Sequence, residues 1–227
     1  MFVRIETRPH NRLPWATLGI ALVAVGGFLL LESLDESQRR AVLIRFGMTP
    51  GILSDLWSAP QGAVLLKTIT AAFASLAMHA NWLHLLGNLV FLLIFGPPSE
   101  RLLGPTRLLV LFLVCGALAN VAGALTLGTS AAPIVCASGA VSSIVGAYLA
   151  LFPRSHLGLV LPLGLFLEFV RVPTAWLIGV WAVIQVLFAW IDPSFGRVAW
   201  SIHIAGFIAG VLFALSSRAA IARRQRN

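Results

Sequence analysis

Residues 134–150, IVCASGAVSSIVGAYLA, combine an apolar segment with small residues at a helical spacing. Ser138, Ser142 and Gly146 are four residues apart, so they share one face of a helix. A face of small residues lets two membrane helices approach closely. Ser138 is therefore a packing residue, a polar contact for a neighbouring helix, or a nucleophile. The other segments of the sequence provide the evidence that distinguishes these roles.

The composition of the whole chain indicates an integral membrane protein. Of its 227 residues, 59% are apolar and only 11% are charged, whereas soluble domains are about 45–50% apolar and about 25% charged. The apolar runs are long and continuous, which favours membrane-spanning helices over the short alternating strands of a barrel. Cys115 and Cys136 lie in apolar segments without metal-ligand spacing.

The apolar runs predict six spans. They lie at about 14–31, 82–95, 108–127, 134–152, 173–191 and 198–215. Residues 32–75 form a long first loop with short amphipathic pieces, and residues 156–173 are expected to be a connection at the membrane surface. We expect an all-α, six-helix bundle with a single domain over residues 1–227, made of a stub at about 1–13, the bundle at about 14–216 and a basic tail at about 217–227.

The charge of +8 at pH 7 predicts the orientation of the chain in the membrane. Six spans place both termini on the same side, and most of the 16 Lys and Arg residues fall in the loops and tails of that side. Cytoplasmic loops carry such an excess, so both termini are predicted to be cytoplasmic and Ser138 lies near the outer end of the fourth span. This distribution argues against nucleic-acid binding.

A few strongly polar side chains lie within the predicted spans, where they are costly and mark functional sites. His84 and Asn88 share a face of the second span, and His79 lies just before it. In the sixth span, His203, Gly206 and Gly210 share a face. Asn120 is expected to form an interhelical hydrogen bond, and the tryptophans Trp176, Trp181 and Trp190 are expected to be packing residues or interface anchors.

If the fourth and sixth helices pack through their small residues, Ser138 and His203 meet. A serine hydroxyl becomes nucleophilic when a base takes its proton, and neutral imidazole suits that task. No Asp or Glu lies in the predicted spans, so the pair would be a dyad. Asn88, His84 and the backbone N–H of Ser138 are candidate oxyanion donors. The histidines lack the third ligand of a metal site, so we expect no metal and no cofactor.

Four motifs resemble the rhomboid family of intramembrane serine proteases. They occur in the order of the family over most of the chain, and they read HANWLHLLGN (79–88), GPPSERLLG (96–104), CASGAVSSIVGAYLALFPR (136–154) and HIAGFIAG (203–210). The first fits the family's His-x4-His-x3-Asn pattern, the second its Gly-x3-Glu-x3-Gly turn, and the third its nucleophile segment. Each motif alone would be a weak signal, but four in register are a strong one.

The resemblance implies a role for each motif residue. Ser138 would be the nucleophile and His203 the general base, with His84 and Asn88 serving the oxyanion hole. Structural roles near the site would fall to His79, Gly139, Cys136, Gly206, Gly210 and Glu100. The first loop would be embedded in the membrane, and the fifth span would be the mobile gate through which a substrate helix enters.

Two features depart from the family pattern. Cys136 stands where the family usually has the first Gly of its nucleophile motif, and a side chain there would narrow the cleft or shift the loop. The family's Trp-Arg pair in the first loop is missing at its expected distance before His79, and Lys67 is the nearest basic residue upstream.

The resulting expectation is an intramembrane serine endopeptidase in a bacterial inner membrane. Its partners would be transmembrane protein substrates and the lipid bilayer, with one copy of the chain sufficient for catalysis. One alternative is a catalytically inactive rhomboid-like binder or chaperone of membrane proteins. Another is a small transporter, although the repeats and broken helices typical of transporters are not seen in the sequence.

Overall fold

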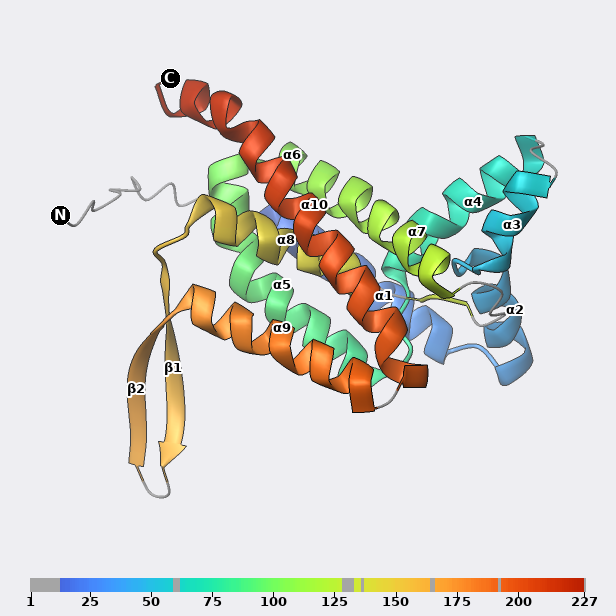
Figure 1. Ribbon diagram of the computed structural model, residues 1–227, viewed down its shortest axis with the longest axis horizontal. Helices are drawn as coiled ribbons and strands as arrows, with labels where there is room; N and C mark the ends of the chain where they lie inside the picture. Colours follow the sequence, from blue (N-terminus) through green and yellow to red (C-terminus); the bar gives the residue numbers. More distant parts are fainter. Residues whose placement is uncertain are drawn as a thin grey trace.

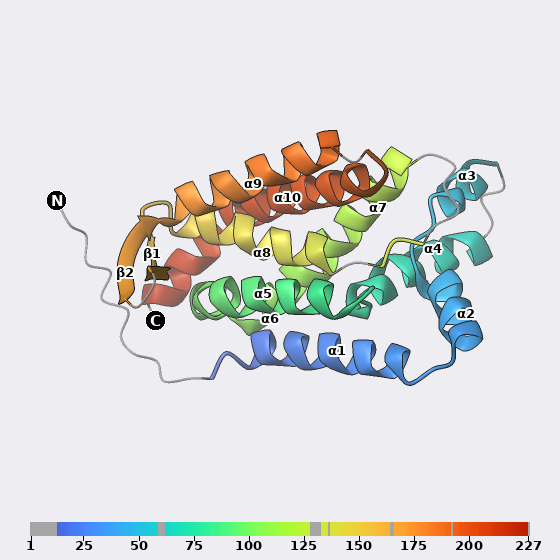
Figure 2. The same cartoon turned by 90° about the horizontal axis from the view of Figure 1, so that it is seen from below.

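The computed structural model describes residues 13–58, 62–127, 133–135, 137–163, 166–191 and 193–226. Cys136 therefore lies outside the described residues. The main helices run side by side along one axis (Figures 1 and 2). They are α1 (Trp15–Glu32), α5 (Trp82–Leu103), α6 (Pro105–Val110), α7 (Gly116–Leu127), α8 (Ser138–Leu151), α9 (Thr174–Ile191) and α10 (Pro193–Arg226). A π-helical segment, Leu111–Cys115, joins α6 to α7.

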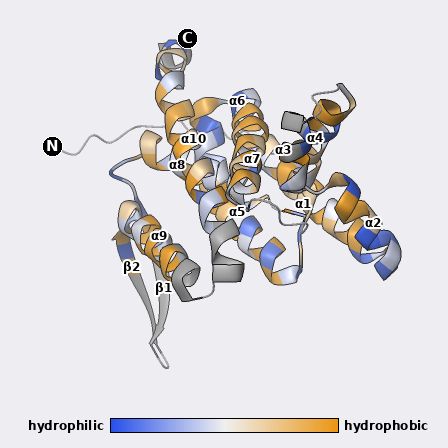
Figure 3. Cartoon of the chain, turned by 45° about the vertical axis from the view of Figure 1, so that its right-hand side comes forward, coloured by the Kyte–Doolittle hydropathy of each residue, from blue (hydrophilic) through white to orange (hydrophobic). Residues whose placement is uncertain are grey.

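Four helical stretches of the described chain are long and apolar enough to cross a membrane. They are Trp15–Glu32, Trp82–Leu103, Pro105–Thr126 and Trp200–Arg223. Ser138–Leu151 and Thr174–Ile184 are apolar but shorter. Figure 3 shows hydrophobic residues over most of these helices, while hydrophilic residues are prominent on the short helix α2. This chain is a membrane protein with several spanning helices.

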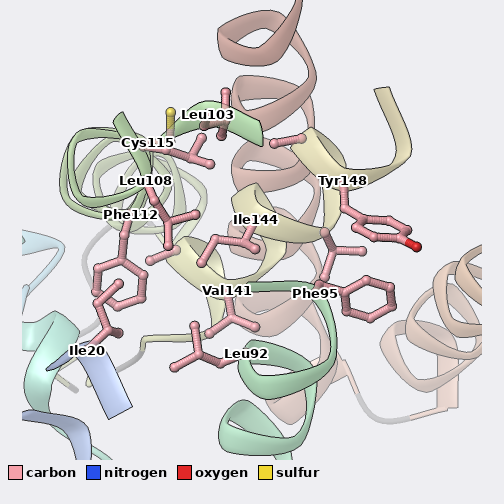
Figure 4. Packing of buried hydrophobic residues seen from close by; sticks show 14 of the residues in the cluster. Ile20, Leu92, Phe95, Leu103, Leu108, Phe112, Cys115, Val141, Ile144 and Tyr148 are labelled. Carbon is pink, nitrogen blue, oxygen red and sulfur yellow. The ribbon is translucent and has the colours of Figure 1, made fainter. Parts of the chain in front are cut away.

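Helix α8 occupies the centre of the bundle, and every residue from Ser138 to Tyr148 is buried. In the core, Val141 and Ile144 of α8 lie between Leu92 and Phe95 of α5 on one side and the residues of α6 and the π-helical segment on the other (Figure 4). Tyr148 meets Phe95 edge to face, with ring centroids 5.0 Å apart. Burial on all sides explains why this sequence segment is apolar or small at every position.

Glycines set the separation of α8 and α10. A Cβ on Gly206 would overlap the carbonyl oxygen of Gly139, and a Cβ on Gly210 would overlap that of Ser143. In the opposite direction, a Cβ on Gly146 would overlap the carbonyl oxygen of Phe207. The two helices are therefore in backbone contact, as small-residue faces allow in membranes.

The N-terminus of α1 is capped by a carboxylate from another helix. Glu100, near the end of α5, accepts hydrogen bonds from the backbone N–H groups of Ala16 (3.0 Å) and Thr17 (2.8 Å) and from the Thr17 hydroxyl (2.7 Å). Its side chain is buried. A negative charge at this position satisfies N–H groups that lack partners within the helix and complements the helix dipole. Glu100 thus ties α5 to α1.

The connection between α1 and α5 is folded into short helices at the end of the bundle away from the β-strands (Figures 1 and 2). These helices are α2 (Glu36–Phe46), α3 (Gly51–Ser58) and α4 (Gly62–Ala74), followed by a 3-10 turn at Ser75–Ala77. Asp35 begins α2 through a capping box with Gln38. Between α2 and α3, Met48 forms an antiparallel bridge with Ile134, with N···O distances of 3.1 and 2.8 Å.

Residues 156–163 and 166–173 form two paired β-strands, which the all-α expectation did not include. Strand β1 (His156–Leu163) pairs antiparallel with β2 (Phe166–Pro173) and links α8 to α9. The segment is rich in Val, Leu and Phe, and β-branched and aromatic residues favour extended pairing. Its base is closed by the hydrogen bond from Thr174 N–H to Ser155 O (2.9 Å). The hairpin projects across the direction of the helices (Figure 1).

Candidate active site

Ser138 and His203 are hydrogen-bonded. The Nε2 atom of His203 lies 2.6 Å from Oγ of Ser138, although the residues are 65 positions apart in the chain. Ser138 is the first residue of α8 and His203 lies within α10. The backbone contact of Gly139 with Gly206 holds the two helices at the separation that this hydrogen bond requires. The geometry is that of a hydroxyl beside a base that can accept its proton.

The position of Ser138 at a helix N-terminus favours negative charge beside it. The residue before it, Ala137, provides no side-chain cap. The first N–H groups of any helix have no intrahelical partner, and those of α8 lie at the positive end of the helix dipole. A carbonyl attacked by Ser138 would develop its negative charge close to these groups, as in an oxyanion hole.

Asn88 provides a buried donor on the neighbouring helix α5. Its side chain is only 9% exposed, and its Nδ2 atom has no hydrogen-bond partner among the described residues. Buried amide groups are nearly always paired, so an unpaired one requires an explanation. α5 packs directly against α8. An amide on that helix whose partner arrives only with a reacting carbonyl would account for the unpaired group.

His79 and His84 lie together at the start of α5. Asn81 caps the helix by accepting from the His84 backbone N–H (2.9 Å), and the two imidazole rings meet edge to face at 5.4 Å. His79 precedes the helix and is fully buried. Burial, and to a lesser extent the nearby His84, lower the pKa of His79 to about 4. His79 is therefore neutral at pH 7.

The aromatic ring of Trp181, on α9, contacts the imidazole of His203. Their ring centroids are 5.6 Å apart at an interplanar angle of 41°. The same indole lies 6.0 Å from the ring of Phe91 on α5. The sequence predicts Trp181 only as a packing residue or interface anchor, because no spacing rule relates it to His203. Its place beside the dyad is visible only in the structure.

Arg39 anchors the first-loop helix α2, a task for which the sequence offered no residue. Its Nη1 atom lies 2.7 Å from Oε1 of Glu32 at the end of α1, and its Nη2 donates to the carbonyl oxygen of Ala80 (3.1 Å). One guanidinium thus joins α2 to α1 and to the segment that carries His79. The signal in the sequence was the capping box at Asp35, which predicts a helix and so places Arg39 on it.

Asn120 forms the interhelical hydrogen bond expected of it. Its Nδ2 donates to Oγ of Ser75 (2.9 Å), which joins α7 to the 3-10 turn before His79. Of the other expected site residues, Gly139, Gly206 and Gly210 lie in the α8–α10 contact, whereas Glu100 caps α1 and is not part of the cluster around Ser138. Among the described residues, no three His, Cys, Asp or Glu side chains are placed to hold a metal ion.

Comparison with known families identifies the region that contains this site. The model of the Rhomboid domain matches residues 66–219, which include Ser138, His203, His84 and Asn88. No curated protein matches the chain.

Proposed function

Because the chain belongs to the rhomboid family, whose members are intramembrane serine proteases that act on transmembrane substrates, we propose that it is an active endopeptidase that cleaves the transmembrane segments of other membrane proteins. The observation that carries this proposal is the hydrogen bond of 2.6 Å between Ser138 Oγ and His203 Nε2. A member that had lost its activity would have no need to keep a nucleophile and a base in this geometry.

The proposed reaction begins with attack of Ser138 Oγ on the carbonyl carbon of the scissile peptide bond, while His203 Nε2 takes the hydroxyl proton. The C–N bond then breaks, and His203 returns the proton to the leaving amine. Ser138 is left as an ester with the N-terminal part of the substrate. A water molecule gives its proton to His203 and attacks the ester, which releases the new carboxyl group and restores Ser138.

Three groups of donors support the tetrahedral intermediate in this proposal. The first N–H groups of α8 and the Nδ2 atom of Asn88 bind the oxyanion, and His84 contributes from the same helix as Asn88. The buried carboxylate of Glu100 does not assist His203, because it is bound to the N-terminus of α1. We assign His79 and the glycines of the α8–α10 contact to the support of this arrangement.

The length of α8 supports a reaction inside the membrane. Its 14 residues rise about 21 Å at about 1.5 Å per residue, less than the ~30 Å of a hydrocarbon core. With one end of α8 at the membrane surface, Ser138 at its other end lies below the opposite surface. We infer that α8 and α9 complete a set of six spans in a single domain, with cytoplasmic termini and Ser138 toward the outer side of a bacterial inner membrane.

A rhomboid-like binder without activity is the alternative, and Cys136 in the nucleophile motif is the observation that favours it. One experiment separates the two. The wild type, Ser138→Ala and His203→Ala are each reconstituted in liposomes with a single-pass reporter protein, and product is followed by mass spectrometry. We expect cleavage by the wild type alone.

The outcomes of this experiment are distinct. Cleavage by either variant at the wild-type rate would remove the dyad assignment. If the wild type is silent and Cys136→Gly gains activity, the cysteine blocks the cleft. If both stay silent across several reporters, the chain is a binder.

A further inference from the structure

Helix α9 contacts the site through the side chain of Trp181. Its outward residues are strongly exposed, with Trp176 at 72% and Val183 at 59%. Ile178 is buried at 5%, and Trp181 follows one helical turn later on the same face. Among the described residues, α9 packs chiefly along α10. Its contact with α5 includes the ring of Phe91, which lies 6.0 Å from that of Trp181.

Trp181 therefore touches two parts of the molecule at once. Its indole lies where α9 contacts α5, beside the ring of Phe91. The centroid of the indole is 5.6 Å from that of the His203 imidazole. A flat ring at that distance and angle restricts rotation of a neighbouring ring through van der Waals contact and ring–ring interaction. The imidazole must keep Nε2 on Ser138 Oγ for the hydroxyl proton to pass to it.

We propose that Trp181 is the positioning residue of the general base, and that α9 carries it so that the position of this helix and the orientation of His203 are linked. The proposal rests on the proposed protease function. When α9 moves away from α5, Trp181 leaves Phe91 and His203 together. The base is then held only if an incoming substrate segment takes the place of the indole, so an empty open site is less reactive than an occupied one.

The linkage differs from a purely steric gate in a measurable way. A gate limits the entry of a substrate helix, and removing its bulk speeds turnover. A positioning residue acts on the nucleophile itself, and its loss slows even a reagent small enough to reach Ser138 without moving α9. A fluorophosphonate is such a reagent, because it reacts only with an activated serine and carries no transmembrane helix.

The test measures the second-order rate of fluorophosphonate labelling at Ser138 in the full-length protein in micelles. Four proteins are compared with the wild type, namely Trp181→Phe, Trp181→Leu, Trp181→Ala and the control Trp176→Ala, which changes an exposed tryptophan of the same helix. We expect Trp181→Ala and Trp181→Leu to react at least about tenfold more slowly. Trp181→Phe keeps a flat ring and stays within about threefold, and Trp176→Ala stays at the wild-type rate.

The Trp181→Leu variant separates loss of the ring from misfolding, because leucine fills apolar space but has no planar ring. Labelling of Trp181→Leu at the rate of Trp181→Phe would overturn the proposal. Labelling of Trp181→Ala faster than the wild type would also overturn it, because that result indicates a steric gate. With a transmembrane reporter, Trp181→Leu lowers kcat and leaves KM unchanged, whereas a substrate-binding role would change KM. A wild type that labels no better than Ser138→Ala would instead refute the protease function, independently of Trp181.

Discussion

The side chain of Ile202 fills the space in which a Cβ of Gly139 would lie. The ideal Cβ position is 2.7 Å from Ile202 Cγ2 and equally 2.7 Å from the Cβ of Ala119. Ile202, the residue before His203, thus packs directly under Gly139, the residue after Ser138. This contact fixes Ser138 and His203 relative to each other through their immediate chain neighbours.

Gly139→Ala is therefore expected to lower activity by at least about tenfold and to reduce stability by about 1–3 kcal/mol, because overpacking forces the two helices apart. Gly179→Ala is the matched control, since a Cβ there meets nothing within 4 Å. Cleavage of a reporter and thermal unfolding in micelles would be measured for both. Wild-type activity of Gly139→Ala would show that the α8–α10 contact tolerates movement.

Glu100→Gln is expected to destabilise the fold by about 2–4 kcal/mol, since charge-assisted hydrogen bonds to the N-terminus of α1 are lost or replaced by an amide donor that faces other donors. Thr17→Val removes only the hydroxyl bond of 2.7 Å and costs less. Unfolding in mixed micelles gives the stabilities. Because Glu100 is not in the dyad cluster, activity per folded molecule is unchanged. A specific loss of turnover without loss of stability would contradict this assignment.

Arg39→Ala is expected to loosen the first-loop helix more than Glu32→Gln does. The ion pair is partly exposed, with side chains 31% and 36% accessible, and such pairs contribute about 0–1 kcal/mol. Arg39 also donates to Ala80, and that bond survives in Glu32→Gln. Hydrogen exchange of the peptides that cover α2 and residues 78–81 would detect the difference. Equal exchange in both variants would mean that the bond to Ala80 contributes nothing.

The buried His79 makes stability depend on pH. Its pKa is about 4 in the folded protein, against an ordinary value of 6.5, so between these values the unfolded chain binds a proton that the folded protein does not. The contribution of His79 to stability is thus largest above pH 6.5 and declines as the pH falls toward 4. His79→Leu should show a shallower decline over this range in unfolding experiments. A slope equal to that of the wild type would place the acid sensitivity elsewhere.

The sequence was sufficient to predict the helical membrane protein and the meeting of Ser138 with His203, because both follow from local periodicity. Small residues at helical spacing identify the contact faces of α8 and α10, and the polar residues at the start of these faces are Ser138 and His203. The expected spans also matched α1, α5 and α9 closely at their N-terminal ends.

The features that the sequence did not predict depend on contacts between distant elements. A short apolar run does not distinguish a strand from other structure, so residues 156–173 are expected to be a connection at the membrane surface and not two strands. Trp181 has neighbours on two other helices, and Arg39 has neighbours on another helix and in a loop. No spacing within one segment encodes such contacts. Sequence motifs of a site therefore omit the residues that hold the motif residues in place.

The π-helical segment Leu111–Cys115 gives the third span two phases. Each residue of a helix corresponds to a rotation of about 100°, and a π turn inserts one residue into the helical repeat. Before it, α6 packs against α1 and α5; after it, α7 packs against α10 and α4. Deleting one residue there would restore a single phase and turn Asn120 away from Ser75. The contact of Asn120 with Ser75 thus depends on the number of residues in this span, and an insertion or deletion here would misplace the residues of α7 that follow.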